Sequence, residues 1–332
     1  DGIRDCLLSR GLGDVYKRQV IGKLKDSYIF TSETCALDIV GATFVREVEN
    51  GEIVFIENNK IDCIKPFPKQ KPRPCVFEYI YFARPDSLIN GKCAYEYRKK
   101  LGSELSKEND LNADMVVPVP DSGVPAAIGF AENSKKPFEL GLIRNHYVGR
   151  TFIEPTQNIR SLGVKLKLSS TKTIVKNKSI ILIDDSLVRG TTCTKIVKML
   201  YESGAREVHV RIACPEIKFP DFYGVDMPTR EELLAFKKDN SEMCDYINAK
   251  SLKFLSLEGL YKALTGEKRN TNYPQFSDHY FTGQYPIEPT DNLSGLKINQ
   301  LLALNPKSAP PSQEAFAYAV CGLKKQRGGG GG

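Results

Sequence analysis

The chain has 332 residues, of which 41% are hydrophobic and 26% charged, a balance typical of a globular protein that buries one core and part of a second. No stretch approaches the roughly 20 apolar residues of a membrane helix, and the first residues lack the basic start and apolar block of a secretory signal. These features exclude an integral membrane protein, and we expect a cytoplasmic one.

The formal net charge of +7 at pH 7 is concentrated at the two ends of the chain. Residues 1–19 contribute +1 and residues 305–332 contribute +3, which leaves +3 for the body. A basic surface over a site for an anionic small molecule explains this charge, and no zinc-finger or RNA-recognition signature is present. We therefore expect small-molecule substrates and no nucleic-acid or membrane partner.

The cysteines and histidines show no metal-ligand spacing. The nine cysteines include no C-x-x-C pair and lie in a chain too long to need disulfide stapling, so we interpret them as reduced thiols. The three histidines lie far apart in the sequence. Any bound metal is expected to be a hard cation on oxygen ligands.

The two ends of the chain differ in character from its body. Residues 1–19 show no hydrophobic period and are interpreted as a non-native leader, and residues 305–332 as a disordered or foreign tail. Residues 20–64 alternate apolar and polar side chains, which predicts β-structure, and the proline- and lysine-rich segment 65–74 predicts a linker. The β-rich stretches are 27–33, 38–48 and 51–57.

Strands alternate with helices in residues 75–304, which predicts an α/β domain with a parallel sheet flanked by helices. The ligands of such sheets bind beyond the carboxyl ends of the strands, so sites are expected just after Pro120 and Ile183. The predicted strands are Val76–Phe82, Met115–Pro120, Ile180–Ile183 and Val208–Ala213, and the predicted helices are Cys93–Asn109, Val124–Asn133 and Thr192–Ser203.

The sequence IILIDDSLVRGTT, residues 180–192, carries the strongest functional signal. An apolar strand ends there in Asp184 and Asp185, whose carboxylates can bind ribose hydroxyls directly or through Mg²⁺. The small residues that follow open a helix and offer hydroxyl and N–H groups to a 5′-phosphate. A capped helix after an ordinary turn is the alternative, but two adjacent acids at a buried strand end are electrostatically costly without a cation.

This motif closely resembles the phosphoribosylpyrophosphate-binding motif of the type I phosphoribosyltransferases. Four further segments narrow the resemblance to the amidophosphoribosyltransferase family, over about residues 20–285. The resemblance implies a type I phosphoribosyltransferase fold, preceded in residues 20–64 by a remnant of an N-terminal-nucleophile glutaminase domain. The segments are CVFEYIYFARPDS (75–87), VPVPDSGVPAAIGFA (117–131), LIRNHYVGRTFIEPTQNIRSLGVKLKLS (142–169) and PEIKFPDFYGVDMPTREELLA (215–235).

The resemblance also implies roles for individual residues. The tight loop at residues 121–123 would hold pyrophosphate, although an ordinary strand-to-helix turn is the alternative. The basic segment 144–167 would close over the pyrophosphate and exclude water, with a solvated run of charges as the alternative. The implied catalytic residues are Tyr147 and Arg150, and the implied ammonia channel is lined by Tyr79, Tyr147 and Ile153, with core packing as the alternative for Tyr79 and Ile153. The implied substrate-binding residues are Asp121, Ser122, Gly123, Asp184, Asp185, Ser186, Arg189, Gly190, Thr191 and Thr192, and the implied Mg²⁺ ligands are Ser122, Asp184 and Asp185.

The implied reaction is the first committed step of purine synthesis. Ammonia, taken from glutamine in the intact enzyme, displaces pyrophosphate from phosphoribosylpyrophosphate and gives 5-phosphoribosylamine. Such a site needs no protein nucleophile, because positioning, charge neutralisation and water exclusion supply the catalysis. The family also suggests a homo-oligomer and inhibition by purine nucleotides.

Two departures from the family pattern carry expectations. The amide-hydrolysing cysteine at the mature N-terminus is absent, so we expect this chain to use ammonia and not glutamine. Some relatives hold an iron–sulfur cluster, but only Cys75 matches a ligand position. Asp221 stands at a second position and residues 272–283 contain no cysteine, so we expect no cluster and interpret Cys75 as a buried structural thiol.

Two other functions were weighed against this one. A salvage phosphoribosyltransferase would share residues 180–192 but lack the segments EYIYFARPDS (78–87) and NHYVGRTFI (145–153), both of which are present. A phosphoribosylpyrophosphate-binding regulatory protein that binds DNA would need a helix-turn-helix segment, whereas residues 20–64 indicate β-structure.

Overall fold

The computed structural model describes residues 19–57, 60–109, 111–145, 168–223, 225 and 229–287. The chain divides into two compact units, with the boundary between Gln70 and Lys71. This boundary lies inside the proline- and lysine-rich segment 65–74.

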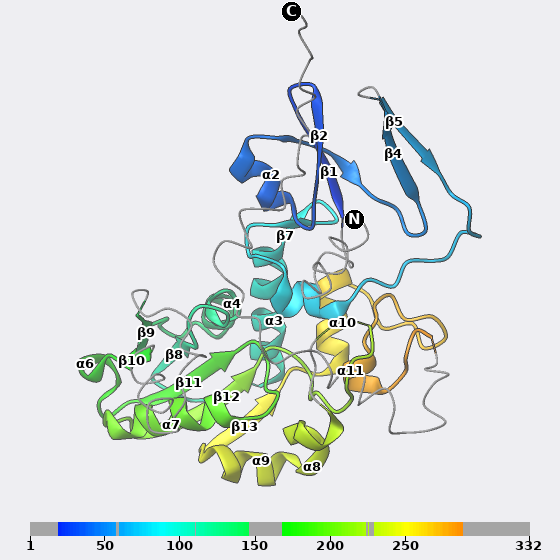
Figure 1. Cartoon of the computed structure of the whole chain (residues 1–332). Coiled ribbons are helices and arrows are strands. Elements are labelled where there is room, and N and C mark those ends of the chain that lie inside the picture. The colour runs from blue at the N-terminus through cyan, green and yellow to red at the C-terminus, as the bar shows by residue number, and fades with distance from the viewer. Residues whose placement is uncertain are drawn as a thin grey trace, which may run out of the picture. The chain divides into compact units, whose positions relative to one another are not determined.

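The first unit contains antiparallel strands and a short helix (Figure 1). Strand β1 pairs with β2 on one side and β3 on the other, and β4 pairs with β5 in a separate hairpin. Leu37 of α2 packs over Gly22 of β1, where a built Cβ would lie 2.5 Å from Leu37 Cδ2. The elements are β1 (Val20–Leu24), β2 (Ser27–Thr31), α2 (Thr34–Val40), β3 (Thr43–Glu47), β4 (Ile53–Glu57) and β5 (Lys60–Ile64).

The prediction of a strand across residues 38–48 is wrong for its first part. Helix α2 continues to Val40 and ends at Gly41, whose φ of 71° lies in the left-handed region that glycine adopts without strain. Thr34, Cys35 and Leu37 are the buried residues of this helix. Over a helix of only seven residues, periodicity alone does not distinguish a helical from a β-like pattern.

The second unit is built on a four-stranded sheet of order β13-β12-β11-β8. All of its pairings are parallel, which confirms the predicted sheet type. Strands β8, β11 and β12 are almost entirely buried, as expected when both faces of a parallel sheet are covered. The strands are β8 (Met115–Pro118), β11 (Ser179–Asp184), β12 (Glu207–Ile212) and β13 (Ser251–Phe254), the last of which the sequence analysis did not predict.

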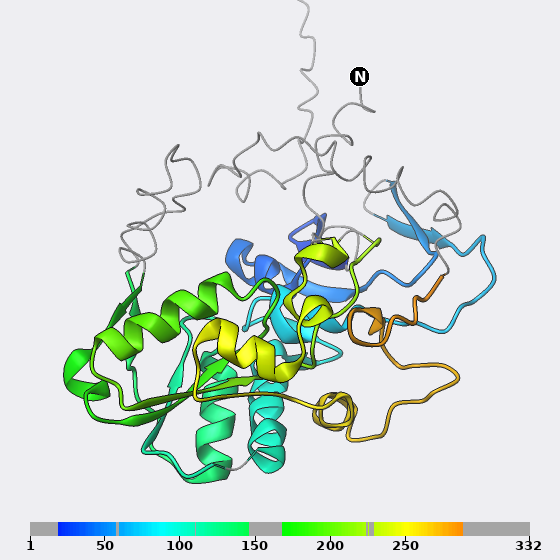
Figure 2. The same ribbon diagram turned by 90° about the horizontal axis from the view of Figure 1, so that it is seen from below.

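Helices cover both faces of this sheet (Figures 1 and 2). Three helices lie on one face, where α4 contacts β8 and β11 and α3 packs between α4 and α10. On the other face α7 packs on β12 and α9 on β13. These helices are α3 (Ala94–Glu108), α4 (Val124–Ser134), α7 (Thr191–Glu202), α9 (Asn240–Ile247) and α10 (Leu257–Thr265).

Glycines let α3 and α4 approach closely. A Cβ built on Gly129 of α4 would lie 1.8 Å from the carbonyl oxygen of Lys99, and one built on Gly102 of α3 would lie 1.8 Å from the carbonyl oxygen of Ala126. The two helices therefore touch backbone to backbone, and only glycine is accommodated at these positions.

The predicted strand Val76–Phe82 is wrong, because the segment is helical and ends in a π-helical turn, η2 (Glu78–Phe82). Arg98 of α3 gives the physical reason. Its buried guanidinium donates from Nε to the carbonyl of Tyr79 (3.1 Å) and from Nη2 to that of Ala83 (2.6 Å). The wide turn thus presents carbonyl groups to a buried charge, an arrangement that a short apolar run in a sequence does not reveal.

Several short elements complete the described part of the chain. No helix among the described residues has both the length and the apolar character to cross a bilayer. The short elements are β6 (Leu88–Ile89), β7 (Lys92–Cys93), β9 (Leu142–Arg144), β10 (Leu168–Ser170), α6 (Lys172–Val175), η3 (Arg230–Glu232), α8 (Leu234–Lys237) and α11 (His279–Thr282).

Candidate functional site

Two loops meet at the carboxyl edge of the sheet. The loop after β8 donates from Val119 N to the carbonyl of Ile183 (2.8 Å) and turns back through a bond from Gly123 N to Val119 O (2.9 Å). A Cβ on Gly123 would lie 2.5 Å from the oxygen of Ile183. The two predicted site segments, after Pro120 and after Ile183, are therefore neighbours in the structure.

Two adjacent carboxyl groups stand where β11 ends, Asp184 half-buried and Asp185 buried. Burial raises the pKa of Asp184 well above its ordinary value, and the adjacent charge of Asp185 raises it further. Burial also raises the pKa of Asp185, while hydrogen bonds from Ser122 and Ser186 lower it. Ser122 thus joins the aspartates across the two loops, and a cation at this point would relieve the repulsion.

The loop from Asp184 into α7 encloses a hollow of about 220 Å³. Gly190 precedes the helix with φ of 75°, a conformation that favours glycine. The N-terminal N–H groups of a twelve-residue helix open at this point, and Thr191 and Thr192 are exposed in its first turn. The hollow is lined by Asp184, Ser186, Leu187, Val188, Arg189, Gly190, Thr191, Thr192 and Cys193.

Charged partners surround these loops. Asp121 is exposed and its Oδ2 accepts from Nη1 of Arg144, in β9, at 2.6 Å. Arg189 donates from Nε to Oε2 of Glu232 at 2.7 Å. Sequence reasoning named Asp121 and Arg189 but missed Glu232, because no pattern links residues that are 43 positions apart.

The other predicted site residues differ in placement. Tyr147, Arg150 and Ile153 lie outside the described residues. Tyr79 is buried, its hydroxyl accepts from Asn90 Nδ2 at 2.9 Å, and its ring makes edge contacts with neighbouring aromatic rings. This environment is that of a core residue.

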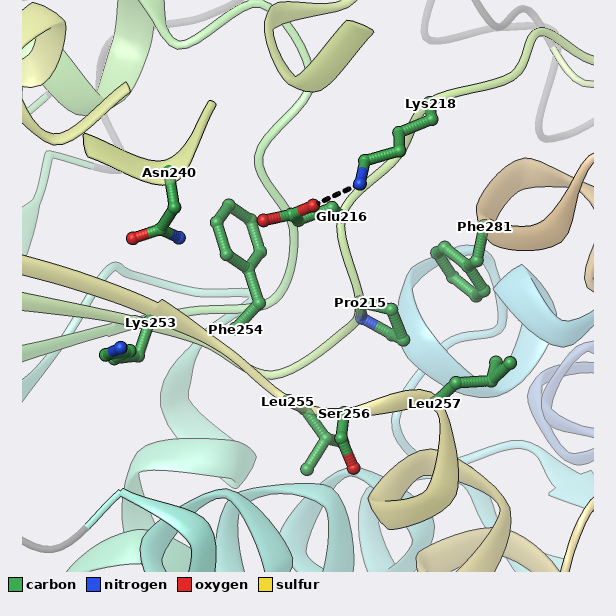
Figure 3. Close-up of a pocket in the computed structure, with 10 residues that line it drawn as sticks. All are labelled: Pro215, Glu216, Lys218, Asn240, Lys253, Phe254, Leu255, Ser256, Leu257 and Phe281. Atoms are coloured by element: carbon green, nitrogen blue, oxygen red, sulfur yellow. Dashed lines mark ion pairs between the residues drawn. The ribbon is translucent and has the colours of Figure 1, made fainter. Parts of the chain in front are cut away.

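A second hollow, of about 350 Å³, lies beyond β12 and β13 and was not anticipated from the sequence (Figure 3). Its cationic Lys218 pairs with Glu216 at 2.6 Å, and the phenyl ring of Phe254 lies beside this pair. Apolar side chains supply much of the remaining lining. Its acid Glu216 and its hydroxyl residue Ser256 are single and lie far apart in the sequence, so the hollow lacks the adjacent pair of acids that distinguishes the loop after β11.

The residues compared with cluster ligands meet in one polar cluster. Asp221 Oδ1 and His279 Nε2 are 2.8 Å apart, and His279 Nδ1 is 3.1 Å from Ser277 Oγ. Cys75 Sγ lies 3.3 Å from Tyr280 Oη, and Cys75 is half-buried, not fully buried as we expected. In the described ranges no three Cys, His, Asp or Glu side chains gather into a metal-binding group. The absence of an iron–sulfur cluster stays a prediction.

Comparison with known proteins places these features in a family. No protein-family model matches the chain. It is 56% identical over 291 residues to the amidophosphoribosyltransferase of Rhizobium etli, covering 86% of this chain and 59% of that one. It is 45% identical over 280 residues to the chloroplastic amidophosphoribosyltransferase of Vigna aconitifolia, covering 84% of this chain and 56% of the relative.

A solved structure supports the same relationship. Glutamine phosphoribosylpyrophosphate amidotransferase from B. subtilis, complexed with ADP and GMP, aligns with a TM-score of 0.75 and 46% identity over 82% of this chain and 60% of that chain. The chain thus spans a little more than half the length of its relatives. It belongs to the amidophosphoribosyltransferase family.

Proposed function

We propose that the second unit carries the phosphoribosyl-transfer site of an amidophosphoribosyltransferase. One observation carries this proposal: the half-buried Asp184 at the end of β11 and the buried Asp185 that follows it lead directly into a hollow capped by the N-terminus of α7. A ribose carrying a 5′-phosphate matches that pairing of acids with N–H and hydroxyl donors. The relatives to which the chain is similar are named amidophosphoribosyltransferase and glutamine phosphoribosylpyrophosphate amidotransferase.

Mg²⁺ is the cofactor that these residues fit. The donors are the carboxylates of Asp184 and Asp185 and the hydroxyl of Ser122, all oxygen atoms, and Mg²⁺ is bound through one or two carboxylates plus substrate oxygens. When bound, Mg²⁺ would neutralise charge on the departing pyrophosphate. Burial raises the pKa of both carboxyl groups, and a cation beside them would favour their ionised form.

The residues of the two loops would each bind a different part of the substrate. Gly190, Thr191 and Thr192 would hold the 5′-phosphate, and the two aspartates the ribose hydroxyls. The loop 121–123 would hold pyrophosphate. The nitrogen of ammonia then forms a bond to C1 as the bond from C1 to the pyrophosphate oxygen breaks, and the proton that the nitrogen loses passes to the departing pyrophosphate. Catalysis follows from fixed geometry and water exclusion, to which Tyr147 and Arg150 would contribute.

The rest of the chain is assigned by the same relationship. We propose that residues 20–64 correspond to part of the glutaminase domain, that 65–74 form a linker and that 75–304 form the transferase domain. Because a solved relative is complexed with ADP and GMP, purine nucleotides are proposed ligands of this protein. A homo-oligomer is proposed from the family alone.

The test is pyrophosphate release from phosphoribosylpyrophosphate and Mg²⁺, with ammonium chloride or glutamine as the nitrogen source. The Asp184→Asn, Asp185→Asn double variant is expected to lose at least about 100-fold in rate, the scale of one strong electrostatic contribution. Asp245→Asn, an exposed acid on α9, is the matched control. Substrate binding without release under either condition, in folded protein, would instead support a regulatory sensor.

A further inference from the structure

The segment 230–237, formed by η3 and α8, braces the loop that precedes α7. Leu234 N donates to the carbonyl of Val188 at 2.9 Å. A Cβ on Gly190 would lie 2.7 Å from Leu234 Cδ2 and 3.1 Å from Tyr246 Cε1, so these side chains pack directly on the glycine. A backbone bond and packing therefore fix the position of this segment against the loop.

Glu232, in the same segment, contacts the charged side chain of Arg189, which lines the hollow. Its Oε2 accepts the Nε hydrogen of Arg189 at 2.7 Å, and the two side chains are 51% and 54% exposed. Among the described residues, Nη1 and Nη2 of Arg189 make no hydrogen bond. The carboxylate of Glu232 thus holds Arg189 through Nε alone. The Nη1 and Nη2 donors, which can bind a phosphate bidentately, stay available.

We propose that Glu232 is a positioning residue that presents Arg189 to the 5′-phosphate of the substrate. This inference rests on the proposed function of the same loop. A free arginine side chain loses conformational entropy when it binds an anion, and holding it beforehand reduces that cost. Glu232 also brings a negative charge towards a phosphate dianion, so positioning and repulsion act in opposite directions and only measurement of binding separates them.

The experiment measures ribose 5-phosphate binding to the full chain by calorimetry, together with KM for phosphoribosylpyrophosphate and kcat. Glu232→Ala is expected to raise the Kd roughly 3- to 10-fold, the scale of immobilising one flexible side chain. KM should rise in parallel while kcat stays within about twofold, because the phosphate is distant from the bond that breaks. Glu232→Gln keeps an oxygen acceptor for Nε and should lose less.

A double-variant cycle gives the decisive readout. In an Arg189→Ala background, Glu232→Ala should cause no further loss, because the residue it positions is gone. Glu231→Ala, which removes an exposed acid from the same turn, should leave binding unchanged. Equal losses in both backgrounds, or tighter binding in Glu232→Ala, would overturn the proposal. Ribose 5-phosphate binding needs no turnover, so the coupling between Glu232 and Arg189 can be measured even if the chain releases no pyrophosphate. A wild-type chain that binds no ribose 5-phosphate would overturn both this proposal and the proposed function.

Discussion

Gly123 lies against the carbonyl oxygen of Ile183 so closely that a built Cβ would be 2.5 Å from it. The contact joins the loop after β8 to the strand end that carries the aspartates. Gly123→Ala should force these loops apart, raise KM for phosphoribosylpyrophosphate at least about 10-fold and destabilise the fold by roughly 1–3 kcal/mol, as overpacking does. Steady-state kinetics and urea unfolding measure both. Gly91→Ala, strained at φ of 74° but with open space around it, should lose stability with an unchanged KM.

Gly129→Ala should destabilise the second unit through the contact between α3 and α4. The added methyl group would lie 1.8 Å from the carbonyl oxygen of Lys99, a distance that only backbone movement relieves. A loss of about 3 kcal/mol is expected, larger than the gain of up to roughly 1 kcal/mol that alanine brings to a helix. Thermal unfolding measures it, with Ser134→Ala at the end of α4 as the control. A variant as stable as wild type would show that α3 and α4 can move apart at little cost in free energy.

Stability of the second unit should fall as the pH is lowered through 6.5, because burial and the nearby charge of Arg211 lower the pKa of His209 from that value. The unfolded chain then binds a proton that the folded chain excludes, until the folded pKa is also passed. One such group adds a slope of at most about 1.4 kcal/mol per pH unit. His209→Asn should reduce the pH dependence of the urea unfolding midpoint between pH 7.5 and 5. The same slope in wild type and variant would assign it to other groups.

Iodoacetamide should distinguish the cysteines by burial. Burial raises the pKa of Cys193 and of Cys214, and both thiols are inaccessible, whereas Cys63 is exposed. Labelling of Cys63 at pH 8 should be at least about 100-fold faster than that of the two buried thiols, which should react only on unfolding. Peptide mass spectrometry resolves the sites. Rapid labelling of Cys193 in the native protein would show that the loop before α7 opens.

Local pattern was enough to predict the parallel sheet and to predict that the two candidate site segments lie at one edge of it. Strands β8 and β11 are apolar on both faces, and chain direction alone brings the residues after Pro118 and Asp184 to one edge. The predicted boundaries differ from the observed ones by one or two residues, as fraying element ends do.

Contacts between residues that are distant in the sequence could not be predicted from it. The turn Glu78–Phe82 is helical because buried Arg98 needs its carbonyl groups, and that need arises only after α3 has packed. Glu232 meets Arg189 across 43 positions, and His279 meets Asp221 across 58. A single sequence carries no periodicity that connects such partners.

The polar cluster around Asp221 has a consequence for how this protein can change. Both carboxylate oxygens are occupied, Oδ1 by His279 and Oδ2 by the backbone N–H groups of Tyr223 (2.8 Å) and Val225 (2.7 Å). A cysteine introduced at position 221 alone would leave the His279 ring nitrogen and the two backbone N–H groups without this partner, at a cost of roughly 1–3 kcal/mol for each group that is buried. A stable replacement of Asp221 would therefore require compensating changes among its partners, because one side chain serves a histidine and two backbone groups at once.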